Sequence, residues 1–146
     1  MKDEFYVMRT PEQREGLQDM IVWINNIKPT SEMRMIEIGS YVGESTLMFA
    51  KHFKEVVSID PYINDYDLDD DACHHAPFDK VYEQFIRNTL SVPNIKSIKE
   101  TSQNAFSILK GGLFSSFKLP HCVKLTIIAI IDKSFILFNF LYLINK

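Results

Sequence analysis

Residues 33–46 read MRMIEIGSYVGEST, and this stretch, with the segment that follows it, decides the fold. Residues 33–38 are short and apolar and end at a glycine, which is typical of a buried strand. Residues 44–53 then predict a helix, and residues 55–59 (EVVSI) predict a second, β-branched strand that ends at Asp60. A strand, a glycine turn, a helix and a strand in this order form a βαβ unit, which joins two parallel strands by a right-handed crossover.

A helix is expected upstream of this unit. Thr10 can cap it, Pro11 suits the first helical position, and Gln13 completes a capping box. Apolar residues then recur at helical spacing from Leu17 onward, and Pro29 ends the element. This helix should cover one face of the sheet.

Downstream of the unit, helix and strand alternate once more. Residues 64–77 form a polar, acidic loop, residues 78–90 a helix, residues 95–99 a third strand, and residues 102–109 a short helix. The order β-α-β-α-β-α predicts an α/β fold, a Rossmann-like doubly wound parallel sheet that is incomplete on its C-terminal side.

Residues 113–146 differ in character from residues 1–112, which we assign to the N-terminal helix and the βαβαβα domain. Two interpretations of this apolar tail stay open. Residues 125–132 (LTIIAIID) form a fourth buried strand and residues 135–146 an edge helix, or the tail is an out-of-frame product that leaves the domain truncated. The second interpretation rests on the dominance of Phe, Ile, Leu, Asn, Tyr and Lys, which have A/T-rich codons. Translating the other frames of the gene would decide between them.

Composition limits the class of protein. A chain of 146 residues suits one domain, and its 46% hydrophobic residues suffice for a packed core. The net charge of −3 gives no field that would gather phosphate backbones, so a nucleic-acid binder is disfavoured. No membrane span is expected, because Asp132 and Lys133 interrupt the apolar residues 125–144. Cys73 and Cys122 lack a CxxC partner and the N-terminus lacks a secretory signal, so we expect a reduced, cytoplasmic chain.

The glycine spacing indicates which kind of ligand the unit binds. Gly39 lets the backbone turn sharply and lets a ligand approach, and Gly43 opens the following helix. A dinucleotide fold requires G-x-G-x-x-G, whereas the spacing here is G-x-x-x-G with Tyr41 in place of a middle glycine. Glu37 would repel a pyrophosphate but suits a cation. S-adenosylmethionine carries an ammonium and a sulfonium and no phosphate.

The segments MIEIGSYVGESTLMFA and VVSIDPY resemble the first two cofactor motifs of class I S-adenosylmethionine-dependent methyltransferases. They are most similar to the small O-methyltransferase-like branch of that family. The resemblance covers residues 33–109, about half the chain. It implies a Rossmann-like fold, S-adenosyl-L-methionine as cofactor, and methyl transfer to the hydroxyl of a small molecule or sugar. A catalytically incomplete fragment and an NAD(P)-dependent oxidoreductase are the alternatives.

The resemblance also implies roles for individual residues. Asp60 would accept hydrogen bonds from the ribose hydroxyls, and Pro61 or Tyr62 would flank the adenine. The remaining assignments concern the two ends of the cofactor: Glu37, Gly39, Ser40, Gly43 and Ser45 at the methionine end, and Ser102 and Ala105 at the adenine ring.

The acidic loop supplies further candidates. Asp65, Asp67 and Asp69 have the alternating spacing that begins an EF-hand, but residues 70 and 76 break the pattern, so no calcium site is expected. A solvated loop is one interpretation of this segment. Another places it over the cofactor crevice, where His74 or His75 would be a candidate general base. Asp132 is a candidate metal ligand, because an aspartate that ends a fourth strand holds a divalent cation in metal-dependent relatives; we assign no metal to it.

Overall fold

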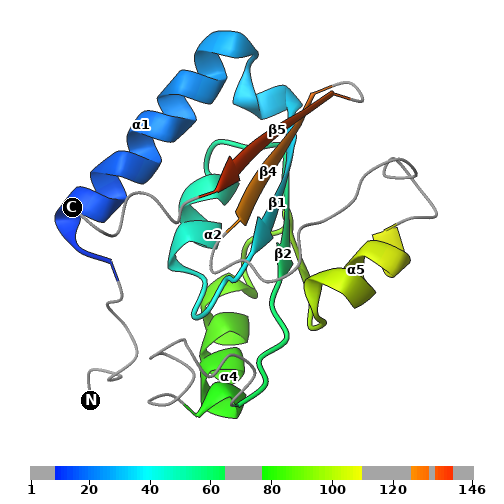
Figure 1. Ribbon diagram of the computed structural model, residues 1–146. Helices are drawn as coiled ribbons and strands as arrows, with labels where there is room; N and C mark the ends of the chain where they lie inside the picture. Colours follow the sequence, from blue (N-terminus) through cyan, green and yellow to red (C-terminus); the bar gives the residue numbers. More distant parts are fainter. Residues whose placement is uncertain (1–8, 65–76, 110–125, 132–133, 140–146) are drawn as a thin grey trace.

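The computed structural model describes residues 9–64, 77–109, 126–131 and 134–139, the last two ranges by their backbone. Helices and strands alternate along the chain (Figure 1). In order they are α1 (Pro11–Ile27), the 3-10 turn η1 (Thr30–Glu32), β1 (Arg34–Ile38), α2 (Glu44–Ala50), β2 (Glu55–Ile59), α4 (Phe78–Thr89), β3 (Ile95–Ile98), α5 (Ser102–Leu109), β4 (Thr126–Ile131) and β5 (Ser134–Asn139).

Helix α1 begins where the sequence predicts. The Thr10 side chain accepts from the Gln13 N–H, the Gln13 side chain accepts from the Thr10 N–H, and Pro11 stands at the first helical position. Two orphan donors of the first turn are satisfied in this way. The buried face of the helix consists of Leu17, Met20, Ile21 and Ile24.

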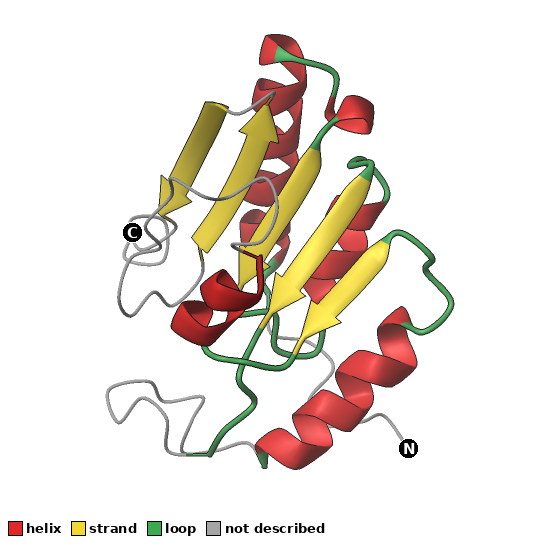
Figure 2. Ribbon diagram, turned by 90° about the vertical axis from the view of Figure 1, so that its right-hand side faces the viewer, coloured by secondary structure: helices red, strands yellow, loops and turns green. Residues whose placement is uncertain are grey.

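The sheet contains five strands in the order β3-β2-β1-β4-β5. β1 pairs with β2 and β2 with β3 in parallel, and Ile38 is aligned with Ile59, so β1 and β2 end together at one edge of the sheet. Helices flank these strands, and the α/β class with a parallel core is therefore confirmed. The helices α1 and α2 lie on one face and α5 on the other (Figure 2).

Alternation along β1 determines which face each of its side chains meets. Met33, which precedes the strand, and Met35 pack with α1 and α2, whereas Ile36 and Ile38 pack with α5. Successive side chains of a strand point to opposite faces. Glu37 therefore shares the face of Met35 and points toward α2.

The second half of the sheet differs from the expectation. β4 pairs with β1 in antiparallel register, Thr126 opposite Ile38 and Ile130 opposite Arg34, so the sheet is not parallel throughout. Apolarity identified the strand, but its direction depends on the edge at which the chain re-enters the sheet. Of the residues that one of the two interpretations puts in an edge helix, residues 135–139 belong to β5, antiparallel to β4. Only two residues separate β4 from β5, and so short a link requires antiparallel strands. The described helices include none that is long and apolar enough to cross a membrane.

Candidate functional site

The loop between β1 and α2 has a left-handed backbone at three positions. Gly39, Tyr41 and Gly43 have φ angles of 84°, 49° and 85°. A Cβ on Gly43 would lie 3.0 Å from the ring of Phe85 in α4, so both its φ and its neighbour disfavour a larger residue. The Asn88 side chain, also in α4, donates to the carbonyl of Val42 over 2.8 Å. Helix α4 thus packs directly on the glycine loop, below the ends of β1 and β2 in Figure 1.

Asp60 holds this loop from the end of the neighbouring strand. Its Oδ2 accepts the backbone N–H groups of Ser40 and Tyr41 over 2.8 and 2.9 Å, and its Oδ1 accepts that of Tyr62 over 3.0 Å. A carboxylate offers about four acceptor positions, and these bonds use three of them. Sequence reasoning selected Asp60 as a ribose ligand and did not foresee that it also orders the glycine loop.

Burial changes the acidity of Asp60. The residue is 6% exposed, and this desolvation raises its pKa above the ordinary range, while the N–H groups of Tyr41, Tyr62 and Ser40 work in the opposite direction. A buried carboxylate without a cation at its side is costly unless donors surround it. The three N–H groups are those donors.

Glu37 lies beneath the first turn of α2. It is fully buried, and its two oxygens accept from the hydroxyls of Ser45 and Thr46. Burial raises the pKa of Glu37; the two hydroxyls and the charge of Arg9 counteract the rise. Because no part of Glu37 is exposed, its charge would reach a ligand through space and through Ser45 rather than by direct contact.

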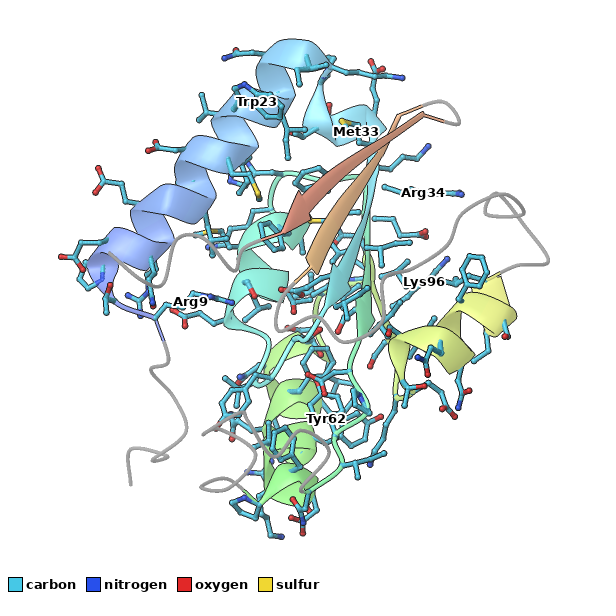
Figure 3. The ribbon with its side chains drawn as sticks, viewed as in Figure 1. Arg9, Trp23, Met33, Arg34, Tyr62 and Lys96 are labelled. Atoms are coloured by element: carbon cyan, nitrogen blue, oxygen red, sulfur yellow. The ribbon has the colours of Figure 1, made fainter. Side chains whose placement is uncertain are left out.

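Arg9 brings a cation to the same place. Its Nη2 donates to Ser45 Oγ over 3.0 Å, and Ser45 in turn donates to Glu37. The side chain reaches from the start of α1 toward the start of α2 (Figure 3). Sequence reasoning missed Arg9, because 36 positions separate it from Ser45 and no motif links the two.

An aromatic cluster forms one side of the loop. Tyr62 has a φ of 49° and is buried, with its ring 4.8 Å from that of Tyr82 and 5.8 Å from that of Phe85, centroid to centroid. Its hydroxyl donates to the carbonyl of Tyr41 over 2.9 Å. Tyr62, expected beside the adenine, therefore packs its ring into the core, and the half-buried Pro61 is left as the more accessible of the two candidates.

The other predicted site residues differ in how deeply they are buried. Ser40 is buried, and its hydroxyl bonds that of Ser58 in β2. Ser102 is half-buried at the start of α5, whereas Ala105 is fully buried among the core residues beneath that helix. The structure thus brings Glu37, Gly39, Ser40, Gly43, Ser45 and Asp60 together, and puts Ala105 in the packed core.

The candidates for general base and metal binding cannot be placed. His74, His75 and Asp132 lie outside the described residues, as do Cys73 and the aspartates of the acidic loop. The strand before Asp132 ends opposite the first residues of β1, which is the edge away from Asp60. In the described part of the chain, no three His, Cys, Asp or Glu side chains gather in a way that could hold a metal ion.

Comparison of the chain with protein-family models, with curated proteins and with solved structures found no match. What the site binds has to follow from its own residues.

Proposed function

We propose that the glycine loop and Asp60 bind S-adenosylmethionine, and that the protein transfers its methyl group to the hydroxyl of a small molecule. The observation that carries the proposal is that two backbone N–H groups of the loop are already hydrogen-bonded to Asp60. These groups, of Ser40 and Tyr41, thus hold a carboxylate of the chain itself.

The two bonds to Asp60 argue against a dinucleotide. A pyrophosphate is bound by free backbone N–H groups of a glycine loop. Here two of those groups are bound to Asp60, and Glu37 is buried close by. Two acidic side chains favour a cationic ligand and repel a doubly charged anion. An NAD(P)-dependent oxidoreductase is therefore the weaker proposal.

Asp60 retains the capacity that a nucleoside requires. Among the described residues, its Oδ1 accepts the N–H of Tyr62, and one further acceptor position stays on that oxygen. A ribose hydroxyl is a suitable donor for it. The left-handed backbone at Tyr41 and Tyr62, which both donate to Asp60, supports a functional role, because such conformations cost about 1–3 kcal/mol and concentrate at binding sites.

Methyl transfer itself makes modest demands on the protein. The acceptor oxygen attacks the methyl carbon, the carbon–sulfur bond breaks, its electron pair stays on sulfur, and the hydroxyl proton leaves to a base or to water. The protein mainly has to hold donor and acceptor in line. His74 and His75 stay candidates for the base.

A second function is favoured by the direction of β4. Because β4 is antiparallel to β1, its carboxyl end lies at the edge away from Asp60. In doubly wound sheets ligands bind at the carboxyl ends of parallel strands. A parallel strand beyond β1 would end at the edge of Asp60 and could supply one wall of an acceptor site, whereas β4 begins at that edge. The alternative is a protein that binds the cofactor without turning it over.

Calorimetric titration with S-adenosylhomocysteine tests the binding. Asp60→Asn should weaken it at least about tenfold, since a hydrogen bond to a charged group is worth roughly 1.5–3 kcal/mol. The matched control is Glu55→Gln, at the opposite end of the same strand, which should bind as wild type does. Melting temperatures without ligand check that both variants fold. Lack of binding by wild type, or equal binding by both variants, would refute the proposal.

Two further measurements separate the candidates. Titration monitored by NADH fluorescence should give no signal, and saturable NADH binding would favour the oxidoreductase. Release of S-adenosylhomocysteine from S-adenosylmethionine in the presence of phenols or sugars would establish turnover. Tight cofactor binding without release for any acceptor would favour the second function.

A further inference from the structure

We propose that Arg9 binds the carboxylate of the cofactor's amino-acid end, and so makes the site selective for ligands that carry a complete α-amino acid. This inference rests on the proposed function, because it names the part of the same ligand that Arg9 would recognise. It adds a residue that neither glycine spacing nor motif resemblance indicates.

The position of Arg9 is fixed by several contacts. The residue directly precedes Thr10, the N-cap of α1, and its guanidinium donates to Ser45. One turn further on, Arg14 Nε lies 2.6 Å from Glu44 Oε1, at the first position of α2. The start of α1 is thereby attached twice to the start of α2, and the guanidinium is held beside the glycine loop.

The charges at this end of the site form a layered arrangement. Glu37 is innermost and fully buried, the buried Ser45 hydroxyl lies between, and Arg9 is outermost and half-buried. An anion therefore lies within and a cation toward the surface. An α-amino acid has the complementary pair, an ammonium and a carboxylate attached to the same carbon.

The ligand's carboxylate has few places to bind. Glu37 and Asp60 both repel it, and neither carries a direct ion pair with Lys or Arg among the described residues. Arg9 is the described cation whose charge reaches Glu37. A guanidinium has five N–H donors in a planar fork, and the bond to Ser45, the one it makes within the described residues, leaves donors that suit a carboxylate.

Titration with three ligands tests the contact between Arg9 and the ligand's carboxylate. S-adenosylhomocysteine carries the whole amino acid, decarboxylated S-adenosylmethionine lacks the carboxylate, and 5′-methylthioadenosine lacks the amino-acid end. Arg9→Gln should weaken S-adenosylhomocysteine at least about tenfold and leave 5′-methylthioadenosine within twofold of wild type. Arg34→Gln, which removes an arginine ion pair at the opposite edge of the sheet, is the matched control and should change neither.

Wild-type protein gives a test that needs no variant: it should bind S-adenosylmethionine at least about tenfold more tightly than the decarboxylated form. Arg9→Lys keeps the charge without the fork and should give an intermediate loss. Unchanged or tighter binding of S-adenosylhomocysteine by Arg9→Gln would overturn the inference and leave the proposed function standing. Failure of the wild-type protein to bind S-adenosylhomocysteine or S-adenosylmethionine would overturn both this inference and the proposed function.

Discussion

At the carboxyl ends of β1 and β2 the acidic side chains are buried, whereas at the amino ends they lie among exposed cations. Glu37 and Asp60 accept hydroxyl and backbone N–H donors in the interior. Glu55 lies between Arg34 and Lys96, whose side chains are 47% and 66% exposed, at 3.5 and 2.6 Å. Arg34 and Lys96 extend from the sheet on the side away from α1 (Figure 3). Acidic residues thus accept donors of the interior at one edge and pair with exposed cations at the other.

The largest effect is expected from removing the buried acceptor. Asp60→Ala leaves the N–H groups of Ser40, Tyr41 and Tyr62 without their partner, which should lower the free energy of unfolding by on the order of 3 kcal/mol. Glu55→Ala removes exposed ion pairs and should lower it by less than about 1 kcal/mol. Urea denaturation of both variants measures the contrast, and equal losses would contradict it.

A second contrast compares the backbone of the glycine loop with that of helix α1. Gly43→Ala forces an L-residue into a φ of 85° and a Cβ against Phe85, so a loss of about 2 kcal/mol is expected. Gly16→Ala is the control, because it lies within α1 with nothing within 4 Å of the added Cβ. Alanine is the better helix former there, by up to about 1 kcal/mol. Thermal unfolding should move the two melting temperatures in opposite directions; a shift in the same direction would be evidence against the packed loop.

The smallest effect is a change in pH dependence. The raised pKa of Glu37 means that the folded state binds more protons than the unfolded state. Its contribution to stability is therefore fully present below the ordinary pKa of 4.5 and is lost as pH rises from there through the raised value. Glu37→Gln should flatten this fall in a series of melting temperatures from acid to neutral pH.

A variant with the opposite expectation sharpens that test. Thr46→Val removes one hydroxyl that holds the Glu37 pKa down, so the fall should extend to higher pH. Asp60, whose pKa burial also raises, stays in wild type and in both variants, so the comparison isolates the change at Glu37. Identical pH profiles for wild type and the two variants would show that Glu37 is not the group responsible.

The local pattern of the sequence predicted the βαβ unit and the glycine loop, because strand, turn and cap preferences act over a few residues. Helix α1 was predicted to begin at Pro11 and to end at Pro29 for the same reason, and it spans Pro11–Ile27. The direction of β4 depends on the path of the chain between distant elements, which no local pattern records. The contact of Arg9 with Ser45 is equally non-local.

The orientation of the Glu37 side chain could have been predicted from the sequence. Met33, Met35 and Glu37 alternate along one strand and share one face, so the carboxylate had to point at the helix packed on that face. Ser45 and Thr46, in the first turn of that helix, are suitable donors. The double role of Asp60 was harder to foresee, because a carboxylate at a strand end suits a ligand and a loop equally well.

The bonds from Asp60 to Ser40 and Tyr41 have a consequence for transplanting this loop. Its shape is not encoded by the glycines alone, since a residue about twenty positions later acts as the template. Grafting GSYVG onto another scaffold without an aspartate at the end of the adjacent strand would transfer the sequence of the loop but not its conformation. The glycine loop and the aspartate therefore have to be transferred or redesigned together.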